Sequence, residues 1–170
     1  MHDFSELSVI IADDSSYFRT VMKSVLRGFG IRNMHEAADG ADCLHAINEK
    51  QPDVLFLDWE MPVFSGPEVM RQIRNEDSQD PFLPVIMVTA HTERARVQQA
   101  TRLGIHELLC KPVAPKSVYQ RLCAVVLTPR PFIRSDSYFG PTPRGYNAPT
   151  AKVAPKPAVA EKPAEDAFLL

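Results

Sequence analysis

VLFLDWEMPVFSG, residues 54–66, is the stretch of the sequence that decides the fold. Four consecutive apolar residues run directly into Asp58, and turn-forming residues follow at Met61-Pro62 and Ser65-Gly66. A short, uninterrupted apolar run of this kind is typical of a strand buried on both faces of a parallel sheet. Asp58 would then lie at the carboxyl end of the strand, where open α/β sheets hold their functional groups.

The composition is that of an ordinary water-soluble domain. The 170 residues include 45% apolar and 24% charged residues, and the net charge of -2 indicates neither nucleic-acid nor membrane binding. No apolar segment approaches the ~20 residues that cross a bilayer, and the first residues do not form a signal peptide. We therefore expect a cytoplasmic protein with no nucleic-acid and no membrane partner. Cys43, Cys110 and Cys123 form no CxxC pair, so we expect reduced, partly buried packing residues.

Short apolar runs alternate with longer amphipathic segments over residues 5–127. The expected strands are residues 7–12, 33–37, 53–58, 84–89 and 107–110. Helices are expected after Ser15 or Ser16, from residue 40, after Ser65, over residues 93–103 and over residues 117–126. This alternation predicts an α/β fold of the flavodoxin-like, doubly wound type, with a five-stranded parallel sheet of order 2-1-3-4-5 and five helices.

The composition changes near Thr128. Residues 128–170 hold eight of the 15 prolines, and residues 148–165 are a low-complexity run of Ala, Pro, Lys and Glu. Such a segment buries too little apolar surface to offset its ordering entropy. We expect a domain at residues 5–127 and a Pro/Ala-rich extended or disordered tail at 128–170. Residues 132–144 carry aromatic and arginine side chains, which would either pack on the domain or form a short recognition segment.

Three carboxylates are expected to meet at the carboxyl edge of this sheet. Asp13 and Asp14 follow the first strand, and Asp58 ends the third. Their repulsion would make burial costly without a divalent cation, and oxygen ligands favour Mg²⁺. A metal beside an aspartate suits phosphoryl transfer, with the carboxylate as nucleophile. Thr89, after the fourth strand, and Lys111, after the fifth, would supply a hydroxyl and a cation for the phosphoryl oxygens.

Four motifs in this order resemble the receiver domain of two-component response regulators, of the CheY-like type. They are Asp13-Asp14, Asp58 in LDWEMP, Thr89-Ala90 and Lys111-Pro112. The resemblance implies that Asp58 accepts a phosphoryl group from a histidine kinase or a histidine phosphotransfer protein. It implies no enzyme in the usual sense, because autophosphorylation and autodephosphorylation act on the protein itself. The basic residues Arg19, Lys23 and Arg27 would form a solvated face or a docking face for the phosphodonor.

The resemblance also implies a set of magnesium ligands. Asp14 and Asp58 would bind the ion directly, Asp13 mainly through water, and Glu60 through its backbone carbonyl. Lys111 would pair first with the carboxylate and then with the phosphoryl group. The Lys111-Pro112 peptide bond is expected to be cis, which an X-Pro bond permits at modest cost.

The readout of the switch is expected to differ from the family pattern. The resemblance implies that Thr89 moves toward the phosphoryl oxygen, and that the side chains of Glu60 and His91 line the entry of hydrolytic water. Leu108 occupies a switch position that is usually Tyr or Phe. A leucine offers neither a hydroxyl nor an aromatic ring, so the output would be weaker or differently wired. Trp59 is expected to be an exposed or half-exposed neighbour of the site.

Two other functions stay open beside a stand-alone receiver. One is a phosphorylation-independent adaptor that keeps the receiver fold and acts through its tail. The other is an aspartyl-phosphate phosphatase of the haloacid dehalogenase type, which is disfavoured because Glu60 replaces the second acid of the DxD pattern. No DNA-binding output domain is expected, because about 43 Pro-rich residues cannot supply its core. The protein would be a monomer or a phosphorylation-dependent dimer with an unknown downstream protein target.

Overall fold

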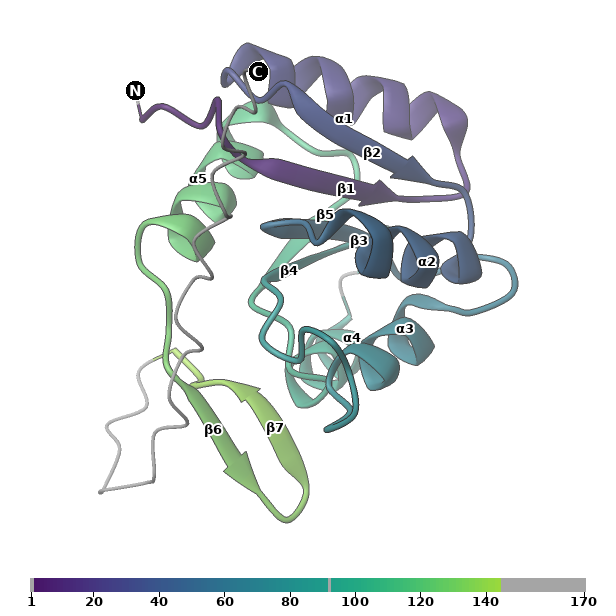
Figure 1. Ribbon diagram of the computed structural model, residues 1–170, viewed down its shortest axis with the longest axis vertical. Helices are drawn as coiled ribbons and strands as arrows, with labels where there is room; N and C mark the ends of the chain where they lie inside the picture. The colour runs from purple at the N-terminus through teal and green to yellow at the C-terminus, as the bar shows by residue number, and fades with distance from the viewer. Residues whose placement is uncertain (1, 92, 145–170) are drawn as a thin grey trace, which may run out of the picture.

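The computed structural model describes residues 2–91 and 93–144, and its centre is a five-stranded parallel sheet (Figure 1). The strands lie in the order β2-β1-β3-β4-β5, which confirms the predicted topology. Their bounds are β1 (Ser8–Ala12), β2 (Asn33–Ala37), β3 (Val54–Asp58), β4 (Val85–Thr89) and β5 (Glu107–Cys110).

The central strand β3 explains the uninterrupted apolar run of its sequence. All five residues of β3 are buried, and the strand pairs with β1 on one side and with β4 on the other. Leu55 and Leu57 face one apolar cluster, whereas Val54 and Phe56 face the other. Because helices cover both faces, no polar residue is tolerated until Asp58 at the carboxyl end.

The helices divide between the two faces of the sheet. On one face, α1 (Ser16–Gly28) and α5 (Pro115–Val126) contribute buried residues such as Leu26 and Leu122. On the other face lie α2 (Gly40–Lys50), α3 (Gly66–Ile73) and α4 (Arg94–Arg102), which contribute residues such as Ile47 and Met70. All five predicted helices are present, and their bounds differ from the expected ones by one or two residues at the ends.

Local capping residues set where the helices begin. Ser15 is the N-cap of α1, and its side chain accepts a hydrogen bond from the backbone N–H of Phe18. Ser65 and Glu68 form a capping box at the start of α3. At Gly66 the chain folds back so tightly that an added Cβ would lie 2.3 Å from the backbone oxygen of Asp58. These features hold the β3–α3 loop against the end of β3.

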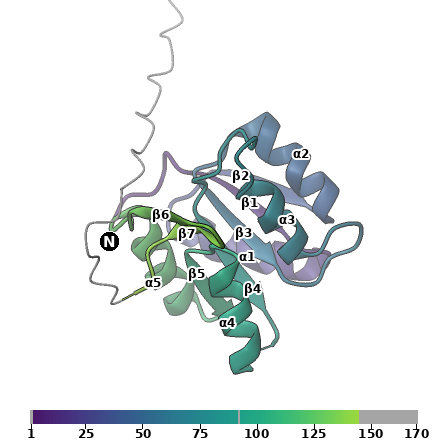
Figure 2. The same ribbon diagram turned by 90° about the horizontal axis from the view of Figure 1, so that it is seen from below.

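Residues beyond α5 add a second, two-stranded sheet. The strands β6 (Phe132–Ser135) and β7 (Tyr138–Pro141) pair antiparallel and form what we call the C-terminal hairpin (Figure 1 and Figure 2). The rings of Phe132 and Phe139 pack edge-to-face with Phe82, which precedes β4, at centroid distances of 5.0 and 5.5 Å. The hairpin therefore packs at the amino ends of β4 and β5, opposite the end that carries Asp58.

This hairpin differs from the extended or disordered segment that we expected from residue 128. Its aromatic residues find a complementary surface on the domain, which is the alternative that residues 132–144 left open. Residues 145–170 of the expected tail lie outside the described residues. The division into a domain at 5–127 and a tail at 128–170 stays a prediction.

Arginine side chains fasten the hairpin to the domain. The buried Arg74 guanidinium lies 5.2 Å from the ring centroid of Phe132 and donates hydrogen bonds to the backbone oxygens of Pro81, Leu83 and Gly104. Burial lowers the pKa of Arg74 to about 10, so the group stays charged at neutral pH. The buried carboxylate of Glu107 pairs with three arginines, namely Arg121, Arg130 and Arg144.

Two smaller expectations need correction. Trp59 is 4% exposed rather than exposed or half-exposed, because its ring joins the apolar cluster beneath α2, α3 and α4. The three cysteines are free, but Cys110 is exposed at the end of β5, whereas Cys43 is buried and Cys123 is half-buried.

Over residues 2–91 and 93–144, no helix combines the length and apolar character needed to cross a bilayer.

Candidate functional site

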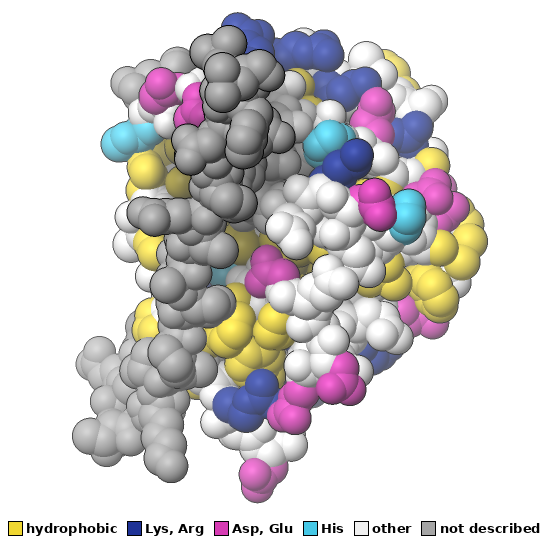
Figure 3. Space-filling view, viewed as in Figure 1, with side chains coloured by type: hydrophobic (Ala, Val, Ile, Leu, Met, Phe, Trp, Pro, Cys, Tyr) yellow, Lys and Arg dark blue, Asp and Glu magenta, His cyan; other side chains and the backbone are white. Residues whose placement is uncertain are grey.

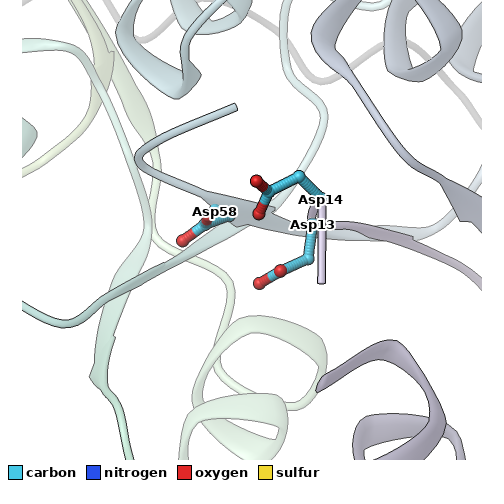
Figure 4. Close-up of side chains that lie close together, drawn as sticks. All are labelled: Asp13, Asp14 and Asp58. Carbon is cyan, nitrogen blue, oxygen red and sulfur yellow. The ribbon is translucent and has the colours of Figure 1, made fainter. Parts of the chain in front are cut away.

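Three carboxylates meet at the carboxyl edge of the sheet, as the topology predicts. Asp13 and Asp14 follow β1, Asp58 ends the neighbouring β3, and oxygens of all three lie within 4.8 Å of one another (Figure 4). Asp13 is 1% exposed and Asp58 is 6% exposed, whereas Asp14 is exposed to solvent. We call these three residues the acidic cluster.

Backbone hydrogen bonds hold Asp13 in place. Its N–H donates to the Ala37 oxygen at the end of β2, and its Oδ1 accepts from the N–H of Ser15 at 2.9 Å. The guanidinium of Arg19 on α1 donates to the backbone oxygen of Asp13 at 2.6 Å. Arg19 was expected only on a solvated or docking face, and this further contact depends on how α1 lies over β1.

Lys111 is the cation of the site. It follows β5, and its Nζ lies 2.6 Å from Asp13 Oδ2 and 3.0 Å from Asp58 Oδ1. The ammonium also lies 4.4 Å from the ring centroid of Phe18 on α1, which gives it a cation–π contact. The Lys111-Pro112 peptide bond is cis, as predicted.

The two partners of this ion pair have shifted pKa values. Burial and the neighbouring charge of Asp13 raise the pKa of Asp58 to about 6, although the hydrogen bond from Lys111 acts in the opposite direction. Burial alone would lower the pKa of Lys111, but its hydrogen bonds to Asp13 and Asp58 outweigh burial and raise it. Lys111 is therefore charged at neutral pH. The ionised form of Asp58 destabilises the folded protein, because its carboxylate is buried beside the charge of Asp13.

A pocket of about 220 Å³ opens above Asp58. Its lining contains six of the predicted site residues, namely Asp14, Asp58, Glu60, Thr89, His91 and Lys111, and it also includes Trp59 and Ala90. Thr89 is 1% exposed, and its Oγ1 accepts a hydrogen bond from the N–H of His91 at 3.0 Å. The structure thus brings together residues from the ends of four different segments of the sheet.

His91 bridges two acidic side chains at the mouth of this pocket. Its Nε2 lies 3.3 Å from Glu60 Oε1, and its Nδ1 lies 3.6 Å from Glu93 Oε1. The predicted pair of Glu60 and His91 therefore lies side by side. Neither the contact itself nor the involvement of Glu93 could be expected from spacing, because Glu60 follows β3 whereas His91 and Glu93 follow β4.

Leu108 lies apart from the pocket. It pairs with Met87 in the register of β4 and β5, and it packs half-buried against the apolar cluster beneath α4. A second contact missed by sequence reasoning joins α4 to the site. The guanidinium of Arg96 lies 4.8 Å from the ring centroid of Trp59, and no sequence signal pairs an arginine with a tryptophan 37 positions earlier.

Comparison with known proteins decides the family. Residues 9–123 match the family model described as the response regulator receiver domain. The chain belongs to the response regulator receiver family. A receiver is a phosphoacceptor signalling domain rather than an enzyme, and it implies a histidine kinase as partner. The family model ends at residue 123, before the C-terminal hairpin begins.

Curated relatives of this receiver include chemotaxis proteins. It is 31% identical over 116 residues to the chemotaxis protein CheY-3 of Vibrio cholerae, covering 68% of this chain and 88% of that protein. It is 32% identical over 116 residues to the chemotaxis protein CheY of Pseudomonas aeruginosa, covering 68% of this chain and 93% of that protein.

Solved structures of CheY proteins resemble the same part of the receiver. The chemotaxis protein CheY4 of Vibrio cholerae matches with a TM-score of 0.65 and 30% identity, covering 71% of this chain and 98% of that one. A complex of CheX with CheY, beryllofluoride and magnesium from Borrelia burgdorferi matches with a TM-score of 0.64 and 25% identity, covering 70% of this chain and 88% of that one.

The acidic cluster is typical of a receiver magnesium site, and its chemistry fits that ion. Three carboxylates face a single ammonium group, so the cluster carries an excess of negative charge that a divalent cation would balance. The donors are all oxygens, which is the set that Mg²⁺ prefers. Two of the carboxylates are buried, so water alone compensates them poorly.

Proposed function

We propose that Asp58 accepts a phosphoryl group from the phosphohistidine of a histidine kinase or histidine phosphotransfer protein, and that this switches protein–protein contacts. The observation that carries the proposal is the contact of Asp58 Oδ1 with Lys111 Nζ, 3.0 Å apart, at the floor of the pocket. Among the three carboxylates, Asp58 alone combines a place in the pocket lining with a contact to Lys111.

The other two carboxylates are less suited to be the acceptor. Both oxygens of Asp13 are engaged, one by the N–H of Ser15 and the other by Lys111, and Asp13 is not part of the pocket lining. Asp14 lines the pocket but is exposed, and its environment would not exclude water. They would instead hold Mg²⁺ together with Asp58 and the backbone carbonyl of Glu60.

The transfer itself uses Asp58 as the nucleophile and Lys111 as the cation. An oxygen of the Asp58 carboxylate attacks phosphorus, a P–O bond forms, and the P–N bond breaks with its electron pair returning to the imidazole of the donor. Lys111 holds the carboxylate before transfer and then donates to a phosphoryl oxygen. Bound Mg²⁺ would neutralise charge on the phosphoryl oxygens.

Thr89, Glu60 and His91 would read and time the phosphorylated state. The Thr89 hydroxyl accepts from the N–H of His91, so its own proton is available for a phosphoryl oxygen. Glu60 and His91 lie 3.3 Å apart at the mouth of the pocket, where they narrow the path of a hydrolytic water. Leu108 would leave the readout to other residues.

The donor would approach the face that carries α1. Basic side chains gather along the top of the molecule over α1 (Figure 3). The α1 residues Arg19 and Lys23 both pair with Glu36. Tyr17 at the start of α1 is 78% exposed. We place this protein in the cytoplasm as a receiver with a protein target, as a monomer or a phosphorylation-dependent dimer.

Acetyl phosphate tests the proposal without knowledge of the kinase. We expect the intact mass of the full chain to increase by one phosphoryl group in acetyl phosphate and Mg²⁺, and not in a chelator. Asp58→Asn should block the increase. Asp53→Asn is the matched control, because Asp53 precedes the same strand at its opposite end and accepts only from Ser8 among the described contacts. Labelling of the Asp58→Asn variant, or no labelling of the natural chain, would overturn the assignment.

Binding of a partner distinguishes the receiver from the adaptor. If captured proteins are the same with and without beryllofluoride, the phosphorylation-independent adaptor is the correct function. The receiver account requires a set that changes.

A further inference from the structure

The helix α4 is held to the domain by few apolar contacts. Of its nine residues only Ala100 is buried, and Val97 remains 38% exposed. Most of its other side chains are polar or charged, including Arg94, Arg96 and Arg102. Because burial of apolar surface is the main force that fixes a surface helix, α4 depends on contacts at its two ends.

The carboxyl end of α4 is firmly tied. The backbone oxygen of Gly104 accepts hydrogen bonds from Nε and Nη2 of the buried Arg74, at 3.0 and 2.9 Å. Gly140 of the C-terminal hairpin packs so closely there that an added Cβ would lie 2.7 Å from the Gly104 Cα. This end of the helix has no room to move without displacing the hairpin.

The amino end of α4 is held differently. Its N-cap, Glu93, makes no capping hydrogen bond through its side chain and instead faces His91. One turn into the helix, the half-buried Arg96 covers the buried ring of Trp59, with the guanidinium 4.8 Å from the ring centroid. A cation–π contact of this kind changes a local equilibrium by about two- to fivefold.

Both partners of this contact are linked directly to the pocket. Trp59 follows Asp58, its N–H donates to the Val88 oxygen of β4, and its oxygen accepts from Gly66. Arg96 follows the segment with Thr89 and His91, which line the pocket with Trp59. A group that enters the pocket and draws Thr89 toward it would therefore move the start of α4 relative to a ring that stays fixed.

We propose that the stacking of Arg96 on Trp59 is a latch that holds the amino-terminal half of α4 in the unphosphorylated protein and opens on phosphorylation. The proposal rests on the proposed function of Asp58. Leu108 cannot take this role, because it has no polar group that could change between buried and exposed positions. The latch gives the site an aromatic readout directly after β3 rather than on β5.

The single tryptophan of the chain makes the latch observable, because all tryptophan emission comes from Trp59. The experiment uses the full chain in Mg²⁺, with and without beryllofluoride as a stand-in for the phosphoryl group. It records the emission of Trp59 and the hydrogen exchange of peptides that cover residues 93–103. The variants are Arg96→Ala, the conservative Arg96→Lys, and Arg94→Ala as a matched control on the same helix.

We expect beryllofluoride to change the emission and to raise exchange at the amino-terminal half of α4 in the natural chain. Arg96→Ala should show exchange raised about two- to fivefold before beryllofluoride is added, with a smaller further rise. Arg94→Ala should behave like the natural chain, and Arg96→Lys should lie between. Acetyl phosphate labelling of Arg96→Ala should be unchanged.

The latch is overturned if Arg96→Ala exchanges in α4 like the natural chain and like Arg94→Ala while labelling is intact. A natural chain that takes up no phosphoryl group overturns the proposed function and the latch together, and intact mass separates the two failures.

Discussion

Replacing Asp58 by Asn is expected to stabilise the metal-free protein at neutral pH. Burial and the charge of Asp13 raise the pKa of Asp58 from 3.8 to about 6. The folded protein therefore holds a proton on Asp58 up to a higher pH than the unfolded chain does, and the free energy of unfolding falls as the pH rises through this window. Above this pH window, the full destabilisation caused by the charged, buried Asp58 carboxylate is present. About two pKa units correspond to ~3 kcal/mol, which is an upper bound.

Asparagine avoids this cost because it carries no charge, and its amide oxygen still accepts a hydrogen bond from Lys111. We expect Asp58→Asn to raise the free energy of unfolding by about 1–3 kcal/mol at about pH 7.5, and by little at about pH 4, where Asp58 is protonated in the folded protein. Urea unfolding in a chelator measures both values, with unchanged m-values as the control for two-state behaviour.

Added Mg²⁺ should narrow the difference at about pH 7.5, because the ion stabilises the natural chain through a carboxylate that the variant lacks. The reasoning is refuted if the variant is less stable than the natural chain at about pH 7.5, or if the difference does not depend on pH.

Three further substitutions test other parts of the account. Lys111→Ala leaves Asp13 and Asp58 buried without their cation, so urea unfolding at neutral pH should show a loss of about 1–3 kcal/mol, and an unchanged stability would contradict the ion-pair geometry. Gly66→Ala places a Cβ 2.3 Å from the backbone oxygen of Asp58 and should slow acetyl phosphate labelling at least about tenfold. Gly28→Ala, whose added Cβ would have no other atom within 4 Å, should not slow the labelling. Phe132→Ala removes a 7% exposed ring from the base of the hairpin and should cost about 2–4 kcal/mol in urea unfolding, with Asp136→Ala as a neutral control; equal stabilities would mean that the hairpin does not belong to the folded unit.

The sheet could be predicted because its signals are local. Four of the five strands are short, mainly apolar runs, and even the weak second strand at residues 33–37 lies where it was expected. The convergence of the acidic cluster then follows from topology alone, since the carboxyl ends of adjacent parallel strands share one edge. Lys111 and Thr89 follow from the same rule.

The rest depended on contacts between segments that are distant in sequence. Trp59 follows a site residue, and it was expected to be exposed or half-exposed, yet α4 brings Arg96 over its ring. Phe132 and Phe139 occur among prolines, as in a solvated tail, but they pack on Phe82 about 50 residues earlier. Periodicity and composition predict the secondary structure of a segment and which of its faces is apolar. They do not predict which other segment that face will contact.

The location of the phosphoryl group tests the central claim most directly. After labelling with acetyl phosphate and Mg²⁺, acidic digestion and fragment mass spectrometry can assign the modified residue. The account predicts one phosphoryl group on Asp58, removed by hydroxylamine because it is an acyl phosphate. A phosphoryl group on Asp13, Asp14 or a hydroxyl side chain, or one that resists hydroxylamine, would contradict it.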